Sequence, residues 1–324
     1  MTSFDTPKKD RMIQFSFVTQ LKFPYPFIVR SIEYTAPFLQ NVHYHDFPQV
    51  WYCKKGKYIH QTETSSYICT PGTMIIISPG KYHSYEIPSD QKVELICIDI
   101  AHDAFINFCN GKFTNVIAHT ALPGLAKDTF NFNDFVHLSK ASKVLAENIL
   151  SKLISSQPHQ KKEEPVNVIK MLDAIFSLPE FKLSADQKQA AESIINSKLL
   201  PIIKSISYMN LNYPKKNISD KLATVSSLCR TNFFKYFREY LGITYSTYLI
   251  MLRVNRAAYS LVYTDYSISY ISDMCGFASC SHMGIYYKKY KGILPKEDRQ
   301  RGKTTRKTQP YIHVSHFSYD EPDK

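Results

Sequence analysis

The sequence predicts an α+β protein of several domains, with an N-terminal β-barrel, a set of middle helices and a C-terminal all-α region built from two helix-turn-helix units. Three observations support this fold class. Short apolar runs fill residues 13–120, helical spacing of apolar residues begins near residue 130, and one helical pattern recurs at an offset of 50 residues near the C-terminus. A chain of 324 residues is also too long for one ordinary core.

The β-region is predicted from short alternating or apolar runs. These runs are Phe27–Val29, Val50–Cys53, Tyr67–Cys69, Met74–Ser78 and Val93–Ile98. Turn residues separate them at Lys55-Gly56, Pro71-Gly72, Pro79-Gly80 and Pro88–Asp90. Many short strands at this spacing are typical of a sandwich or a barrel.

Helical spacing replaces the strand pattern further along the chain. A helix is predicted over Phe135–Leu153, with apolar residues at 135, 138, 145, 149 and 153. The polar stretch Ser155–Glu164 is expected to be a linker or loop, and Val166–Phe176 and Ala185–Ile195 to be further helices. From residue 198 to 299 the pattern predicts helix after helix.

The C-terminal region contains a helix with one apolar and one basic face. Phe233, Phe237 and Leu241 recur every four residues, and Gly242 follows as a helix stop. The opposite face carries Thr231, Lys235 and Arg238. An apolar back and a polar, basic front suit a helix that reads the DNA major groove.

The same unit recurs once. Phe233, Phe237 and Gly242 correspond at one offset to Met283, Tyr287 and Gly292, which indicates an internal duplication. A predicted helix over 244–262, about 27 Å long, joins the two units. Because one turn of B-DNA is about 34 Å, the two recognition helices could enter successive major grooves of an asymmetric site of about 20 base pairs.

The positive charge of the chain is concentrated in this region. The net charge is +12, and residues 198–300 carry 15 Lys and Arg against 6 Asp and Glu, whereas residues 1–197 have a net charge of +1. This asymmetry favours a polyanionic partner, and the alternative is a solvated basic surface.

Other features of the sequence exclude several classes of protein. The seven cysteines form no CxxC pair and indicate a reducing, cytoplasmic location. The first ten residues are polar and no apolar run is long enough for a bilayer, so neither a signal peptide nor a membrane is expected. The absence of P-loop, GxSxG and HExxH motifs argues against an enzyme.

Residues 198–300 resemble the DNA-binding domain of the AraC/XylS family of bacterial regulators. The string GFASCSHMGIYYKKYKGILP, starting at Gly276, matches the strongest motif of the family in order and spacing. The residues that carry the resemblance are Ala223, Phe233, Phe237, Gly242, Tyr248, Leu249, Arg253, Ala257, Leu261, Ile268, Ile271, Gly276, Phe277, Ser281, Lys288, Lys289, Tyr290, Gly292, Pro295 and Arg299.

The resemblance implies DNA contacts from the outward faces of both recognition helices. These residues are Arg230, Thr231, Phe234, Lys235 and Arg238 in the first helix, and Cys280, Ser281, His282, Ile285 and Lys288 in the second. The second unit departs from the family pattern at three positions. Ile285 stands where a polar, base-contacting residue is usual, and Ser272 replaces the usual Ala. Gly284 weakens the helix by about 1 kcal/mol relative to Ala. We therefore expect the second unit to contact mainly phosphates and the first to discriminate bases.

The N-terminal region resembles the cupin-like sensor domain of the same family. His43 and His45 form a His-x-His pair, Gln49 follows, and His83 ends a PGxxH sequence. The candidate effector pocket is His43, His45, Gln49, His60 and His83, with Trp51, Tyr52 and Tyr85 as further candidates. Because Gln49 stands where cupin enzymes carry a Glu ligand, no metal and no cofactor are expected.

We expect four parts of the chain. Residues 1–125 form the effector-sensing domain, 126–197 a helical linker and dimerisation region, 198–300 the DNA-binding domain, and 301–324 a basic flexible tail. The predicted function is a sequence-specific, effector-responsive transcription regulator, with activation the commoner behaviour in the family. The implied partners are double-stranded DNA, a small-molecule effector, RNA polymerase and a second copy of the chain.

Two other functions stay open from the sequence. A cupin-type metal-dependent enzyme with a basic helical appendage would bind metal tightly and lose activity in His45→Ala. A non-specific nucleic-acid binder would show no sequence preference and a steep salt dependence.

Overall fold

The computed structural model describes residues 13–15, 27–45, 47–63, 65–88, 91–100, 114–123, 125–126, 134–155 and 165–308. These residues form two compact units that divide between Leu252 and Arg253. Among the residues that the structure describes, every helix is too short or too polar to span a lipid bilayer.

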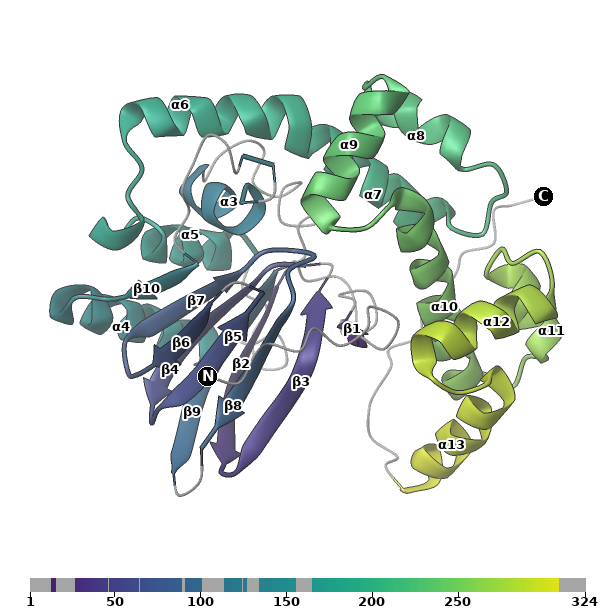
Figure 1. Ribbon diagram of the computed structural model, residues 1–324, viewed down its shortest axis with the longest axis horizontal. Coiled ribbons are helices and arrows are strands. Elements are labelled where there is room, and N and C mark those ends of the chain that lie inside the picture. Colours follow the sequence, from purple (N-terminus) through teal and green to yellow (C-terminus); the bar gives the residue numbers. More distant parts are fainter. Residues whose placement is uncertain are drawn as a thin grey trace. The chain divides into compact units, whose positions relative to one another are not determined.

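Two five-stranded sheets lie face to face and make the barrel (Figure 1). In spatial order, the first contains β1 (Ile13–Phe15), β3 (Phe38–His45), β8 (His83–Ile87), β5 (Tyr58–Thr62) and β6 (Ser66–Cys69). The second contains β10 (Phe135–His137), β7 (Thr73–Ile77), β4 (Gln49–Lys55), β9 (Lys92–Ile100) and β2 (Phe27–Thr35). The β1–β3 pair is parallel and the other pairs are antiparallel.

The five predicted apolar runs lie in β2, β4, β6, β7 and β9, so this part of the prediction is confirmed. The strands β5 and β8 carry polar and aromatic residues and were not recognised as strands, while β3 was expected only through its His-x-His pair. Residues at the end of the predicted β-region instead form helix α3 (Thr114–Ala121).

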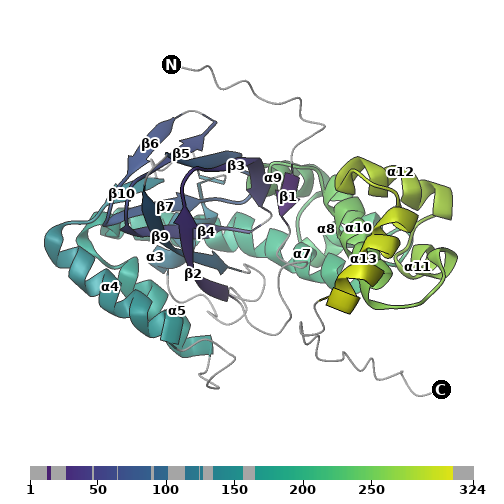
Figure 2. The same cartoon turned by 90° about the horizontal axis from the view of Figure 1, so that it is seen from below.

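Helices pack on the outer face of the second sheet. Helix α3 contacts β7 and α4 (Lys140–Ser155) contacts β2, while α5 (Pro165–Ile175) packs on α3 and α4. The 3-10 turn η2 (Pro179–Phe181) follows, then α6 (Ala185–Ile194), which packs on α3, and α7 (Leu200–Asn212), which packs on the helices that follow it. Figure 2 shows α4 and α5 side by side along this sheet. The Tyr52 hydroxyl on β4 donates to Glu147 on α4 at 2.7 Å, which ties the sheet to the helix.

The structure corrects the helix predicted over Phe135–Leu153. Phe135 lies in strand β10, and the buried face of α4 is Ser142, Ala146, Leu150 and Leu153, while Leu145 is 54% exposed. The predicted spacing joined two elements across a turn, so it started the helix too early and wrongly buried Leu145, whereas Leu153 is buried and Ile149 packs against the core as predicted. The predicted linker at 155–164 lies outside the described residues beyond Ser155.

A π-helical turn, η3 (Ile195–Leu199), joins α6 to α7. The backbone N–H of Leu200 donates to the carbonyl of Ile195, five residues earlier. Pro201 follows, and proline has no N–H to continue the ladder of α-helical hydrogen bonds. The proline therefore explains the local widening of the helix.

The C-terminal helices occur as predicted. They are α8 (Ser219–Ser226), α9 (Arg230–Leu241), α10 (Tyr245–Tyr263), α11 (Ile268–Met274), α12 (Cys280–Lys291) and α13 (Pro295–Thr308). Gly242 and Gly292 end α9 and α12 in the left-handed conformation that favours glycine. Helix α13 extends to Thr308 and so enters the predicted tail, whose residues 309–324 lie outside the described part.

One hydrophobic core runs through the whole first unit. It includes Val50 and Ile98 of the second sheet, Leu172 of α5, Ile202 of α7 and Phe237 of α9. The predicted boundary at residue 197/198 therefore falls inside a continuous core, although the four-part division itself stays a prediction. A second core fills the barrel interior between the sheets.

Candidate functional site

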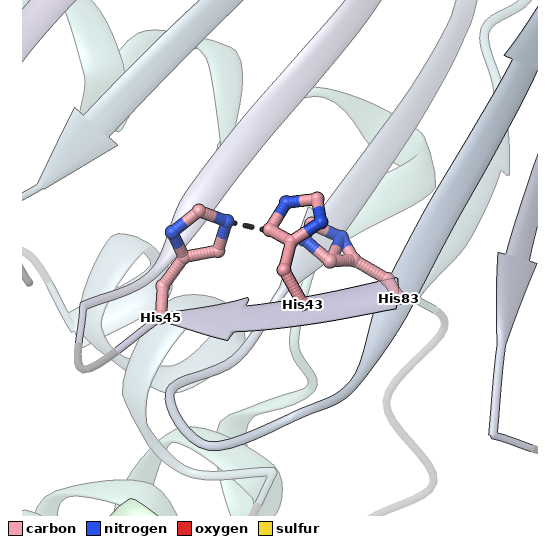
Figure 3. A group of neighbouring side chains, drawn as sticks. All are labelled: His43, His45 and His83. Atoms are coloured by element: carbon pink, nitrogen blue, oxygen red, sulfur yellow. Dashed lines mark hydrogen bonds between the residues drawn. The ribbon is translucent and has the colours of Figure 1, made fainter. Parts of the chain in front are cut away.

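Three histidines meet inside the barrel (Figure 3). His43 and His45 are two residues apart on β3, so their side chains point to the same face of the strand. His43 pairs directly with His83 on the neighbouring strand β8. One ligand nitrogen from each histidine lies within 4.8 Å of the other two. The Nε2 atoms of His45 and His83 are 3.1 Å apart.

His60 on β5 lies next to this group. It is 0% exposed, and its ring centroid is 5.3 Å from that of His83. Among the described residues, neither ring nitrogen of His60 has a hydrogen-bond partner. Four buried imidazoles therefore occupy one end of the barrel interior.

Burial keeps the imidazoles of His45, His60 and His83 neutral. It lowers the pKa of His60 to about 3 and the pKa values of His45 and His83 well below the ordinary histidine value, with smaller contributions from neighbouring imidazoles. Neutral imidazoles have a lone pair available for a metal ion or a hydrogen-bond donor.

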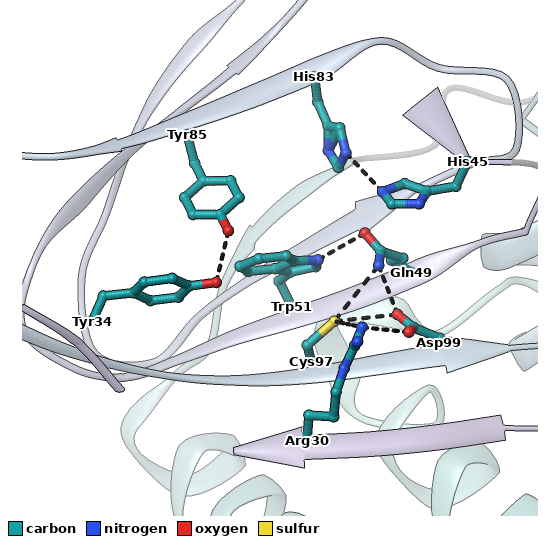
Figure 4. A network of polar contacts seen from close by, with 9 residues as sticks. All are labelled: Arg30, Tyr34, His45, Gln49, Trp51, His83, Tyr85, Cys97 and Asp99. Carbon is teal, nitrogen blue, oxygen red and sulfur yellow. Dashed lines mark hydrogen bonds and ion pairs between the residues drawn. The ribbon is translucent and has the colours of Figure 1, made fainter. Parts of the chain in front are cut away.

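Gln49 belongs to a different network (Figure 4). Its amide nitrogen donates to Asp99 at 2.6 Å, and its amide oxygen accepts from the Trp51 indole N–H at 3.1 Å. Arg30 forms an ion pair with the other oxygen of Asp99. Both ends of the Gln49 amide are thus engaged away from the three histidines.

The sequence reasoning missed Arg30 and Asp99. Asp99 interrupts the buried apolar run Leu95–Ile100 of β9, and Arg30 lies on the neighbouring strand β2. A charge in a buried strand needs a partner, so this pattern could have indicated the pair. Burial raises the pKa of Asp99, while Arg30 and Gln49 act to lower it.

The further candidates divide by strand alternation. Trp51 and Tyr85 face the barrel core, and the Tyr85 hydroxyl is 2.7 Å from that of Tyr34. Tyr52 points the other way and packs with the outer helices, so its expected place beside the histidines was wrong. Since Gln49, Trp51 and Cys53 share one face of β4, Tyr52 must take the opposite face.

Helix α9 presents the predicted basic face to solvent. Arg230, Thr231, Lys235 and Arg238 are exposed, while Phe233 and Phe237 are buried. Phe234 is half-buried: its ring stacks on Tyr245 at 5.1 Å and lies beneath the Arg230 guanidinium at 5.3 Å. Phe234 thus supports Arg230 from below.

Helix α12 presents a second exposed face. Cys280, Ser281, Ile285 and Lys288 are exposed, and Ile285 is 68% exposed. His282 is half-buried, with its ring centroid 5.0 Å from that of Tyr286. The Ser279 hydroxyl accepts from the backbone N–H of His282, whereas Cys229 offers no such cap to α9.

Two family models match the chain. The model of an AraC-like ligand-binding domain matches residues 27–128, which include strands β2 to β9 of the barrel, and the model of a helix-turn-helix domain matches residues 222–301. Both matches lie where the sequence motifs predicted them.

Several curated proteins and solved structures are similar to the chain. The transcriptional activator RhaS of Yersinia pestis is 22% identical over 80% of this chain and 89% of its own length. The regulators ArgR and GbdR of Pseudomonas aeruginosa are 31% and 33% identical, but the match covers only 30% and 26% of their lengths. The structure of ToxT from Vibrio cholerae has the same fold, with a TM-score of 0.50 at 13% identity over 85% of this chain and 98% of that one. With its ligand-binding barrel and two helix-turn-helix units, the chain belongs to the AraC family of transcription regulators.

Proposed function

We propose that this chain is a sequence-specific transcription activator whose DNA binding responds to a small molecule held in the barrel. The observation that carries the proposal is the pair of exposed recognition faces on α9 and α12, each backed by buried aromatic or apolar residues. The proposed partners are double-stranded DNA, the effector and RNA polymerase.

The two faces differ in chemistry, and this suggests different roles. Arg230, Lys235 and Arg238 give α9 three cationic donors, which suit guanine edges and phosphates. The exposed side chain of Ile285 in α12 suits contact with a thymine methyl group, and Lys288 suits a phosphate. We assign base discrimination mainly to α9.

A close contact gives the barrel a direct path to α9. The backbone N–H of Gly80, between β7 and β8, donates to the carbonyl of His45 at 2.7 Å. A Cβ atom at Gly80 would lie 2.3 Å from the carbonyl oxygen of Leu241, the last residue of α9. A ligand that moves His45 or His83 would therefore move the support of the recognition helix.

Two exposed apolar side chains on α4 support a homodimer. Val144 and Leu145 are each 54% exposed on a helix of the predicted dimerisation region. Burial of such a pair against a second copy would remove apolar area from water. Leu145→Glu is expected to shift the protein toward monomer in sedimentation velocity, and an unchanged profile would refute this contact.

Fluorescence anisotropy of the full chain tests the proposed function. Fragments upstream of its own and neighbouring genes would be titrated at two salt concentrations, with scrambled DNA as competitor. Tight binding to one fragment that survives the competitor is expected, and Lys235→Ala should weaken it while the exposed Lys182→Ala should not. Equal, salt-labile binding to every fragment, also in the presence of cell extract as a source of effector, would overturn it.

A further inference from the structure

We propose that His43, His45 and His83 bind one divalent transition-metal ion through three imidazole nitrogens. The inference goes beyond the proposed function and does not rest on it, because the site is defined by the barrel alone. Imidazole is a good ligand for zinc, nickel and copper, and three histidines with an open fourth position form a known type of zinc site.

The geometry of the group fits a tetrahedral ion. Two nitrogens bound to zinc at 2.0–2.1 Å in a tetrahedron lie about 3.3–3.4 Å from each other. The Nε2 atoms of His45 and His83 are 3.1 Å apart, and a nitrogen of His43 lies within 4.8 Å of both. Small side-chain rotations would bring all three nitrogens to one ion.

The strands hold the three side chains in place. His43 and His83 are paired across β3 and β8, and His45 follows on the same face of β3. All three are at least 97% buried, with exposed fractions of 3%, 3% and 1%. A site built on paired strands loses little side-chain entropy when the ion binds.

The position of Gln49 removes the sequence argument against a metal. That argument took Gln49 as a poor fourth ligand. In the structure, the Gln49 amide donates to Asp99 and accepts from Trp51, so it stands outside the histidine group. The proposed metal site therefore consists of the three histidines, and Gln49 is not one of its ligands.

The fourth position indicates the class of ligand that would join the ion. Among the described residues, the group contains three histidines and neither Asp nor Glu, so the ion would keep its charge of +2. The adjacent His60 has two ring nitrogens without a partner in the described part of the chain. A water molecule, or an anionic oxygen of a small ligand, would bind the ion and accept a hydrogen bond from His60.

A hydrogen bond between histidines is the alternative explanation of the short His45–His83 distance. It would use one proton and two nitrogens, and it would leave His60 buried with both nitrogens unsatisfied. Leaving a buried polar group unsatisfied costs about 1–3 kcal/mol. The metal site with its fourth ligand gives His60 a partner, and the hydrogen bond alone does not.

Cobalt titration of the chelator-treated full chain tests the inference. Co²⁺ replaces zinc with the same geometry and has visible absorption bands that are intense only in tetrahedral sites. One equivalent should bind with such bands in the wild type and in the control variant His137→Gln, which removes an exposed histidine on β10. His83→Gln and His43→Gln should weaken binding by more than about 100-fold, the upper range for loss of a merely supporting contact.

X-ray absorption spectroscopy of the zinc-loaded wild type identifies the ligands of the ion directly, so it tests the site even if a histidine variant fails to fold. Three imidazole ligands are expected. No cobalt uptake, uptake unchanged in both histidine variants, or a sulfur ligand from a buried cysteine would each overturn the site. None of these measurements uses DNA, so their failure is distinct from failure of the proposed function.

Discussion

Gly242 and Gly292 end the two recognition helices in nearly the same backbone conformation, with φ of 71° and 75°, but their surroundings differ. A Cβ atom at Gly242 would lie 3.2 Å from the carbonyl oxygen of Gly80 in the barrel. A Cβ atom at Gly292 would meet no described atom within 4 Å. The duplicated position therefore has a packing role in the first unit that the second unit lacks.

The first prediction compares Gly242→Ala with Gly292→Ala. In both variants an alanine must adopt the left-handed backbone conformation, which costs about 1–2 kcal/mol of stability. Only Gly242→Ala also crowds the Gly80 backbone, so it should destabilise the protein further and change how DNA binding depends on the effector. Denaturant unfolding and anisotropy of both variants would check this. Equal effects in the two variants would show that the contact with Gly80 has no role.

Ser272 provides a stabilising prediction. Its side chain is fully buried in α11, and its hydroxyl has no hydrogen-bond partner among the described residues. Ser272→Ala removes a buried unsatisfied group and restores a better helix former, so the free energy of unfolding should rise by about 1 kcal/mol. Thermal unfolding of the two proteins gives the comparison, and a lower midpoint for the variant would contradict it.

The Arg30–Asp99 ion pair should stabilise the barrel. Asp99→Asn leaves Arg30 without its counterion and weakens the bond from Gln49. Loss of one partner of a buried pair costs about 3–5 kcal/mol, and the partial exposure of Arg30 reduces this to about 2–3 kcal/mol. Urea unfolding should show this loss of stability. The control is Glu94→Gln, which breaks the more exposed ion pair between Lys54 and Glu94 and should change the free energy of unfolding by less than about 1 kcal/mol. A smaller loss for Asp99→Asn than for the control would refute the assignment.

Asp134 should make stability depend on pH. Burial raises the pKa of its carboxyl to about 6, against the opposing effect of Lys81. Since the folded state binds the proton more tightly than the unfolded state, this contribution is present below about pH 3.8 and is lost as the pH rises through about 6. Asp134→Asn should therefore be about 1–3 kcal/mol more stable than wild type at pH 8 and nearly equal at pH 4. Urea unfolding at both values checks this, and an equal difference at both would count against the raised pKa.

Lys235 and Lys288 should differ in their effect on DNA binding. If Lys235 reads a base, Lys235→Ala weakens binding to the specific site by about 1–3 kcal/mol more than binding to scrambled DNA. If Lys288 neutralises one phosphate, Lys288→Ala weakens both and lowers the salt slope by about one. Anisotropy at several salt concentrations separates the two effects, and interchange of the two patterns would reverse the assigned roles.

Local patterns were sufficient for much of the structure. The recognition helices were predictable because Phe233 and Phe237, and then Met283 and Tyr287, repeat at helical spacing and are followed by glycine. The buried strands were predictable from continuous apolar runs such as β7. By contrast, the helix predicted over Phe135–Leu153 begins only at Lys140, because Phe135 and Leu138 continue the apolar spacing through a strand and a turn.

The candidate site was predicted in part. The His-x-His pair on one strand implied a shared face, and the structure confirms it for His43 and His45. Nothing local indicated that His83 pairs with His43, that Gln49 would be held by Asp99, or that Arg30 would neutralise Asp99, because these contacts join separate strands.

The sequence by itself determined the fold class, the AraC-type family resemblance and the two recognition faces, because helix periodicity, turn residues and charge act over a few neighbouring residues. The tertiary structure alone decided that three histidines meet around one point, that Tyr52 faces the helices, and that Gly80 supports the end of α9. These relationships depend on strand register and on the packing of distant segments, in which residues far apart in the chain share one buried space.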